Sequence, residues 1–219
     1  MSCCAHCGAI DATFNRRVAE WDLRRYRRKG PHRSTRALVA AIREAGGVAG
    51  ASVLHVGGGV GAVTHELLAA GAARATLVEA SASYLAAARE EAERRQTAAR
   101  VDLRQGDFVA LAAELRPADV VTLDRVICCY PDMESLVASS ARRARRLYGA
   151  VYPRDGWWMR LAVAAVNLAQ RVRGSAFRVY VFPTAAIDAA VRRAGLAPRS
   201  RRRGLVWVVA LYERPATSS

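Results

Sequence analysis

The residues best suited to chemistry begin with a glycine-rich turn. It contains Gly57, Gly58, Gly59 and Gly61, directly after an apolar, β-prone run at residues 51–56 and before an amphipathic segment. Bare backbone of this kind can approach a ligand closely and adopt positive φ angles, which a side chain would hinder. A strand, a glycine turn and a helix in this order form the nucleotide-binding corner of doubly wound α/β sheets.

Two acidic residues follow the turn, each at the end of a further apolar run. Glu79 closes the run at residues 74–79, about 20 residues beyond the glycines, where such sheets place a carboxylate against ribose hydroxyls. Asp107 ends a third run, residues 101–108, in a Gly-Asp step. A glycine turn followed by two acids at strand ends is more specific than any one of these motifs alone.

This combination resembles the class I S-adenosylmethionine (SAM)-dependent methyltransferases. In that family the Gly-x-Gly-x-Gly turn, matched here by Gly57, Gly59 and Gly61, faces the methionine part of SAM. The acid that ends the second strand holds the ribose, which implies this role for Glu79. The acid after the third strand binds the adenine amino group, which implies this role for Asp107. The resemblance implies SAM as the cofactor and methyl transfer as the activity.

One position departs from the family pattern. The family usually has Asp or Glu two residues before the first glycine, where this chain has His55. That acid helps to hold the cationic end of SAM, so either the affinity is lower or another group supplies the contact. The predicted cofactor-binding residues are His55, Gly57, Gly59, Gly61, Glu79, Asp107, Phe108 and Asp124.

Acceptor-side residues are expected after the fourth and fifth strands, because ligands of open α/β sheets lie beyond the carboxyl ends of the strands. Arginine there suits a carboxylate through bidentate pairing, and aromatic side chains suit a planar ring. A carboxylate acceptor needs no general base, whereas a phenol or amine can require one. The predicted catalytic residues are Arg125, Tyr130 and Asp132, and the predicted substrate-binding residues are Tyr26, Tyr152, Arg154, Trp157 and Trp158.

Several of these residues also have a purely structural interpretation. Trp157 and Trp158 fit the core as well as a pocket, and Asp124 fits a buried structural acid. Cys128 and Cys129 are more typical of tight packing than of a nucleophile, since free cysteine buries readily. The segment 124–132, with its Tyr-Pro step, is loosely similar to magnesium-protoporphyrin O-methyltransferases, which implies a porphyrin carboxylate as the acceptor.

The expected strands and helices that position these residues indicate an α/β, Rossmann-like three-layer sandwich. The resemblance, which covers roughly residues 35–213, implies a mostly parallel seven-stranded sheet of order 3-2-1-4-5-7-6 with an antiparallel last strand. Expected strands cover 51–56, 74–79, 101–108, 119–124, 146–153 and a terminal hairpin at 196–213, and expected helices cover 10–29, 35–45, 62–71, 109–115, 133–146, 156–173 and 184–194, with a further long helix capped by Ser81. Ser34 is expected to cap the helix at 35–45.

The N-terminal segment precedes this domain. Residues 1–33 are expected to hold a cysteine-containing start and an accessory helix, 34–214 the methyltransferase domain and 215–219 a loose tail. The side chains expected on the packed face of the accessory helix are Phe14, Val18, Trp21, Leu23 and Tyr26. This helix either packs on the sheet as a support or closes over the cofactor, and in the second case Tyr26, Arg28 and His32 border the site.

Composition limits the class of protein. The 219 residues suit one domain with a full core, and no apolar run is long enough to span a membrane. No secretory signal is visible, so a cytoplasmic location is expected. Cys3, Cys4, His6 and Cys7 have the spacing of half a zinc site, but no second half follows, so no metal is predicted.

The net charge of +15, almost all from arginine, leaves the partner open. The favoured function is transfer of a methyl group to a small-molecule acceptor, a carboxylate or hydroxyl on an anionic or aromatic substrate. A nucleic-acid methyltransferase is the alternative that the charge suggests. An NAD(P)-dependent oxidoreductase is a second alternative, because Gly57-x-Gly59-x-x-Ala62 also fits a dinucleotide fingerprint. A non-catalytic SAM-fold module is a third, suggested by His55, and the oligomeric state is open.

Overall fold

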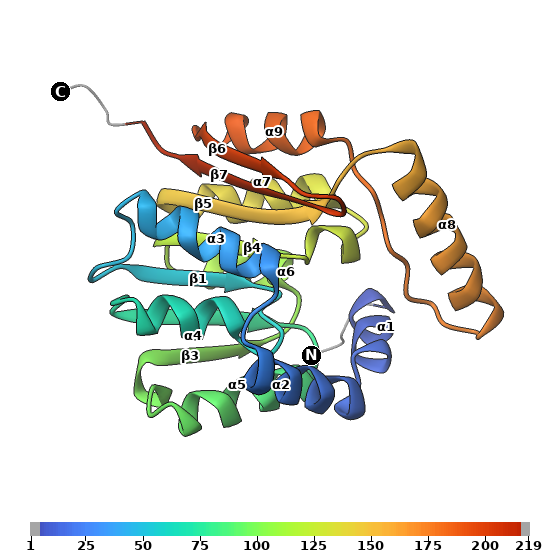
Figure 1. The fold of residues 1–219 in the computed structure, drawn as a ribbon, viewed down its shortest axis with the longest axis horizontal. Coiled ribbons are helices and arrows are strands. Elements are labelled where there is room, and N and C mark those ends of the chain that lie inside the picture. Colours follow the sequence, from blue (N-terminus) through green and yellow to red (C-terminus); the bar gives the residue numbers. More distant parts are fainter. Residues whose placement is uncertain (1–4, 216–219) are drawn as a thin grey trace.

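A seven-stranded sheet forms the centre of the computed structural model, which describes residues 5–215 (Figure 1). Its strand order is β3-β2-β1-β4-β5-β7-β6, as predicted. The strands are β1 (Ser52–Val56), β2 (Arg74–Glu79), β3 (Val101–Gln105), β4 (Ala118–Asp124), β5 (Ala144–Pro153), β6 (Ala197–Arg203) and β7 (Trp207–Glu213). Strands β1 to β5 are parallel, and β7 lies antiparallel between β5 and β6.

Helices cover both faces of the sheet, which is why β1 and most of β4 and β5 are buried and nearly continuously apolar. The α-helices are α1 (Ala5–Thr13), α2 (Arg16–Lys29), α3 (Arg33–Glu44), α4 (Ala62–Ala69), α5 (Ala82–Arg94), α6 (Phe108–Leu111), α7 (Met133–Arg142), α8 (Trp157–Val172) and α9 (Thr184–Arg193). Helices α3 and α4 share one core with the sheet, and α6, α7 and α9 share another.

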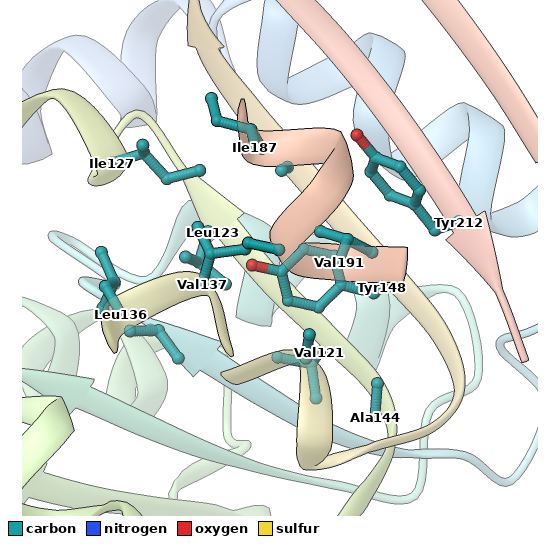
Figure 2. Close-up of a cluster of buried hydrophobic side chains, with 14 of the residues drawn as sticks. Val121, Leu123, Ile127, Leu136, Val137, Ala144, Tyr148, Ile187, Val191 and Tyr212 are labelled. Atoms are coloured by element: carbon teal, nitrogen blue, oxygen red, sulfur yellow. The ribbon is translucent and has the colours of Figure 1, made fainter. Parts of the chain in front are cut away.

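The larger core lies between the sheet and the helices α6, α7 and α9 (Figure 2). Val121 and Leu123 of β4 point into it, and Tyr148 of β5 lies beside them. Leu136 of α7 and Ile187 of α9 close it from the helix side. This packing fixes the loop after β4 relative to the end of β1, and that loop carries several of the predicted site residues.

The accessory helix predicted at residues 10–29 is two helices. The break falls at Phe14 and Asn15, where the Asn15 side chain accepts hydrogen bonds from the first turn of α2 and so starts a new helix. The predicted packed face is also partly wrong: Trp21 is 60% exposed and Val18 is exposed. Ala19, Leu23 and Tyr26 are the buried residues of α2.

Two further boundaries differ from prediction. Helix α3 begins two residues earlier than expected and its N-cap is His32, so Ser34 lies inside the helix and is not its cap. Helix α7 ends at Arg142, because the next carbonyl, that of Arg143, accepts a hydrogen bond from the Ala118 amide at the start of β4. The sheet thus begins where the sequence predicted one more helical turn. Ser81 caps α5 as expected, by accepting from the Tyr84 amide.

Among residues 5–215, no helix has the length and apolarity that crossing a bilayer requires. The division of the chain at residues 33 and 214 stays a prediction.

The core in Figure 2 makes a stability prediction. Leu123→Ala removes a fully buried side chain from it, and we expect the free energy of unfolding to fall by about 2–5 kcal/mol, from lost burial and the cavity left behind. Urea unfolding followed by circular dichroism measures it. Leu205→Ala, at a side chain that is 80% exposed, is the control and should change stability by less than about 0.5 kcal/mol.

Candidate active site

A cavity of about 240 Å³ opens at the carboxyl ends of β1, β2 and β4. Its walls come from the glycine turn, the residues after β2, β3 and β4, and the helices α1 and α2. The predicted residues that line it are Tyr26, His55, Gly57, Gly59, Glu79, Asp107, Phe108, Asp124, Arg125 and Tyr130. The structure therefore brings together most of the predicted cofactor set and two of the three predicted catalytic residues.

The glycine turn forms the floor of this cavity. Gly57 has a φ of +62°, and a Cβ atom there would lie 2.3 Å from Cγ2 of Val126, so no side chain fits. Gly59 has a φ of +54°, and a Cβ there would point to the Tyr84 ring, which also lines the cavity. Bare backbone is therefore needed at Gly57 for both space and conformation, and at Gly59 for conformation. The turn presents the groups that a nucleotide-like ligand approaches.

Glu79 lies next to this turn and is buried. Its carboxylate accepts hydrogen bonds from the Gly59 amide at 2.8 Å and from the Ser81 amide at 2.9 Å. Burial raises the pKa of Glu79 above its usual value, and the backbone N–H groups oppose that rise. The carboxylate joins the tip of β2 to the turn after β1, and it faces the cavity.

Asp107 and Tyr130 meet on another wall. The Tyr130 hydroxyl lies 3.1 Å from both carboxylate oxygens of Asp107. Asp107 also accepts a hydrogen bond from the Val109 amide at 2.9 Å and so caps α6. Tyr130 therefore contacts Asp107, the acid for which the family resemblance implies adenine binding. Its predicted catalytic role did not anticipate this position.

Asp124 and Arg125 lie at the end of β4. The Asp124 side chain is 5% exposed, and its Oδ2 accepts a hydrogen bond from Thr35 at 2.6 Å. Its Oδ1 has no hydrogen-bond partner in the described part of the chain, and its nearest cationic atom is Nε of Arg125 at 3.5 Å. Asp124 thus lines the cavity with one oxygen bound by Thr35 and one buried oxygen that lies beside the Arg125 guanidinium.

Arg125 has an unusual backbone conformation. Its φ is +62°, a left-handed value that costs a residue with a Cβ about 1–2 kcal/mol. Its amide donates to the carbonyl of Val151 at 2.9 Å, which ties the loop to β5. Strained residues of this kind gather at functional sites, where the surrounding structure holds them in place.

His55 occupies the position at which the family usually has an acid. It is buried, and its Nδ1 lies 3.1 Å from the Thr64 hydroxyl. Burial, with His65 nearby, lowers the pKa of His55 to about 3. Burial likewise lowers the pKa of His65, whose ring stacks on that of Tyr26, to about 4. Neither histidine carries a charge at neutral pH, so Asp124 is the acid at this end of the cavity.

Helices α1 and α2 form the cover of the cavity. Phe14, at their junction, contacts the Tyr84 ring edge-on with ring centroids 5.7 Å apart, and its carbonyl accepts a hydrogen bond from Ser81. Asp22 accepts a hydrogen bond from the Tyr84 hydroxyl. Of the two interpretations of the accessory segment, the closing one agrees with this arrangement, and His32 and Tyr26 do border the cavity. Arg28 is exposed and does not line it.

Other residues line the cavity without having been predicted: Ile10, Phe14, Asp22, Arg25, Pro31, Tyr84, Val126 and Cys129 among them. Four of these residues, Ile10, Phe14, Asp22 and Arg25, lie in the N-terminal segment. The interpretation in which that segment closes over the cofactor is the sequence signal that could have found them. Cys128 and Cys129 agree with the packing interpretation, since each thiol approaches the Arg125 carbonyl. The neighbouring Cys128 thiol and burial raise the pKa of the Cys129 thiol well above its usual value. Cys129 is therefore a poor nucleophile.

Six predicted residues do not line the cavity. Asp132 is exposed and caps α7 by accepting a hydrogen bond from the Ser135 amide. Tyr152 is fully buried in the core between β5 and the helices, because the strand turns its side chain away from the site. Gly61 starts α4, with its free space filled by His65. Outside the cavity lie also Arg154, Trp157 and Trp158. Arg154 and Trp157 are exposed, so Trp157 belongs neither to the pocket nor to the core.

Among the described residues, no group of three or more His, Cys, Asp or Glu side chains is placed to hold a metal ion. The side chains of Cys3, Cys4, His6 and Cys7 lie outside the described residues.

A parallel sheet of this order with an antiparallel β7, a glycine turn after β1 and an acid at the tip of β2 defines the class I SAM-dependent methyltransferases. Residues 53–147 match the family described as "Methyltransferase domain". Residues 53–147 thus carry a methyltransferase domain, and the chain as a whole has the fold of the class I SAM-dependent methyltransferases, a class whose cofactor is SAM. No protein with a curated description matches the chain by sequence.

Solved structures share the fold at low sequence identity. Magnesium protoporphyrin IX methyltransferase from Synechocystis PCC 6803, with bound S-adenosylhomocysteine, has a TM-score of 0.73 and 17% identity over 96% of this chain and 100% of that one. An O-methyltransferase family protein from Burkholderia thailandensis has a TM-score of 0.70 and 18% identity over 92% and 61%. A putative sarcosine dimethylglycine methyltransferase from Galdieria sulphuraria has a TM-score of 0.68 and 12% identity over 83% and 85%.

The buried histidines predict a loss of stability in acid. Below about pH 6.5 the unfolded chain protonates His55 and His65, whereas the folded chain resists until their lowered pKa values, about 3 and 4. The folded state is therefore fully stabilised above pH 6.5 and loses roughly 1–2 kcal/mol per histidine between pH 7 and pH 5. Urea unfolding at these two pH values measures the loss, and His65→Gln should reduce it. An equal loss in that variant would contradict the assignment.

Proposed function

We propose that the protein transfers the methyl group of SAM to a carboxylate of a small anionic or aromatic acceptor, and that the cavity after β1, β2 and β4 holds both molecules. SAM supplies an activated methyl group on a sulfonium, so the protein has mainly to align the acceptor. The observation that carries the proposal is the guanidinium of Arg125, held by a strained backbone beside the buried Asp124 in a covered cavity.

The cofactor side follows from the residues on the two sides of the glycine turn. Glu79 is proposed to bind the ribose hydroxyls, since its buried carboxylate faces the cavity next to Gly59. Asp107 and the backbone at Phe108 are proposed to bind the adenine, with Tyr130 holding the Asp107 carboxylate in place. The backbone of Gly57 and Gly59 is proposed to lie against the methionine part.

Asp124 is proposed to supply the charge that His55 lacks. The ammonium group of SAM needs an acceptor, and His55 is uncharged at neutral pH because of its burial. Oδ1 of Asp124 is buried without a hydrogen-bond partner in the described chain, which costs free energy unless a ligand satisfies it. Thr35 holds the other oxygen, so the carboxylate is oriented before the ligand arrives.

The acceptor side is proposed around two arginines. Arg125 and Arg25 both line the cavity, and a guanidinium pairs with a carboxylate through two parallel hydrogen bonds. A carboxylate acceptor is ionised at neutral pH, so the reaction needs no general base. This suits a site whose lining histidines, His32 and His55, both have pKa values lowered to about 4 and about 3.

A small acceptor is favoured over RNA because residues of α1 and α2 line the cavity and narrow the space beside the glycine turn. Two structurally similar proteins are described as acting on small molecules, magnesium protoporphyrin IX and sarcosine dimethylglycine, whereas a third is described as a putative RNA methyltransferase. Retention of RNA with a steep salt dependence would favour the nucleic-acid alternative, since phosphate contacts release counterions.

The ribose assignment predicts that Glu79→Ala weakens SAM binding. Loss of charged hydrogen bonds should cost about 1–3 kcal/mol, or roughly a tenfold to hundredfold rise in the dissociation constant. Isothermal titration calorimetry with SAM measures it. Glu134→Ala, at an exposed glutamate in a surface ion pair, is the matched control and should bind SAM as the parent does. Unchanged affinity in Glu79→Ala would mean that the ribose lies elsewhere.

The acceptor assignment predicts a distinct signature for Arg125→Gln. Incubation with methyl-labelled SAM and candidate carboxylates should yield methyl esters, which release labelled methanol in alkali. In Arg125→Gln we expect the KM for the acceptor to rise roughly tenfold or more, from the lost charged pairing, with SAM affinity near that of the parent. Arg192→Gln, on the exposed side of α9, is the control. Loss of SAM binding in Arg125→Gln would move this residue to the cofactor side.

A further inference from the structure

Helix α8 is loosely attached to the rest of the fold. Figure 1 shows it beyond the carboxyl ends of the parallel strands, at the margin of the molecule. Met159 is the one buried residue among its 16. The Asn167 side chain ties the helix to the returning segment by donating to the carbonyl of Val179 at 2.8 Å and accepting from its amide at 2.9 Å. One side of α8 is thus attached and the other is open.

The open side carries an apolar stripe. Trp157, Leu161, Leu168 and Val172 are 76%, 63%, 64% and 81% exposed. Their spacing of 4, 7 and 4 residues places them within about 60° of one another on a helix that turns about 100° per residue. Met159 lies on the opposite side of the helix and is buried, and Asn167 lies on the flank between them. We name these four residues the α8 stripe.

The stripe has an apolar neighbour in the turn between β6 and β7. Leu205 is 80% exposed, and Val206 beside it is exposed as well. The Arg154 amide donates to the carbonyl of Val206 at 2.8 Å, three residues before α8 begins, which places the turn next to the start of the helix. Val18 and Trp21 of α2 and Val166, on another side of α8, are exposed as well. The six residues named above are the exposed apolar side chains that lie along one side of α8 and in the turn beside its start.

Charge selects the partner for this surface. Arg160 and Arg171 lie along one edge of the α8 stripe, and α8 contains no Asp or Glu. Two copies packed stripe against stripe would bring arginines together without acids to pair with them, which is unfavourable. An anionic bilayer offers phosphates for the arginines and an apolar interior for the stripe, and the chain as a whole carries a net charge of +15.

We propose that α8, with the turn at Leu205 and Val206, lies in the interface of an anionic lipid bilayer. The stripe enters the region between head groups and acyl chains, Trp157 lies at its N-terminal end, and Arg160 and Arg171 bind lipid phosphates.

Docking there connects to the cavity through the segment that follows α8. Phe177 packs edge-on against Phe14 of the cover, with ring centroids 5.3 Å apart, and the Tyr180 amide donates to the Cys128 carbonyl at 2.8 Å. Phe14 and Cys129, the neighbour of Cys128, both line the cavity. A membrane-bound α8 therefore holds the covered active site at the lipid surface.

Vesicle flotation of the full-length protein tests this proposal. We expect the protein to float with vesicles of equal parts phosphatidylcholine and phosphatidylglycerol, and not with phosphatidylcholine alone. Leu161→Asp with Leu168→Asp should reduce binding at least tenfold, and Arg160→Gln with Arg171→Gln roughly tenfold or more. Ala162→Asp with Ala169→Asp adds the same charge to exposed positions of α8 outside the stripe and should bind as the parent does. SAM binding by each variant confirms that it is folded.

Three outcomes would overturn the proposal. The protein could fail to bind the mixed vesicles. The Leu161→Asp, Leu168→Asp variant could bind them as the parent does, which would assign binding to net charge alone. Finally, sedimentation velocity could show a dimer that this variant abolishes, which would assign the stripe to a second copy of the chain.

Discussion

The site depends on one carboxylate that joins two strands. Glu79, at the tip of β2, accepts hydrogen bonds from the amide of Gly59 in the turn after β1 and from the amide of Ser81 at the start of α5. Because β1 and β2 are parallel neighbours, both ends reach the same edge of the sheet, and a buried acid between them holds the turn in its left-handed conformation. This contact positions both the glycine turn and the start of α5. The Ser81 hydroxyl there donates a hydrogen bond to the carbonyl of Phe14, between α1 and α2.

Around that contact, charge is distributed unevenly. The histidines at positions 55 and 65 are buried and neutral, whereas the acids stand at strand tips: Glu79 on β2, Asp107 after β3 and Asp124 on β4. The cavity is therefore lined by carboxylates at the ends of the strands, with uncharged histidines behind the turn. The arginines of the cavity, Arg25 and Arg125, come from α2 and from the loop after β4, and Asp22 lies beside the first of them on α2.

The strands, the glycine turn and the acids at the strand ends could be predicted from local spacing, and the strand order followed from the family resemblance. The sequence did not predict the contacts that shape the cavity, because each joins residues far apart in the chain: Tyr130 to Asp107 across 23 positions, Asp22 to Tyr84 across 62, and Thr35 to Asp124 across 89. Tyr152 shows a different failure. Tyr152 was predicted to line the site because it lies near the end of a strand. Side chains alternate between the two faces of the sheet along β5, so Tyr152 lies on the same core-facing side as Tyr148.

Arg125 has a consequence for how the chain could evolve. A glycine at this position would relieve the left-handed backbone and stabilise the fold by about 1 kcal/mol, while removing the guanidinium. Selection for thermal stability alone would therefore favour glycine at position 125. With the acceptor role proposed above, arginine at this position lowers stability but provides a fixed positive charge, and variants selected for stability should lose turnover as they gain resistance to heat.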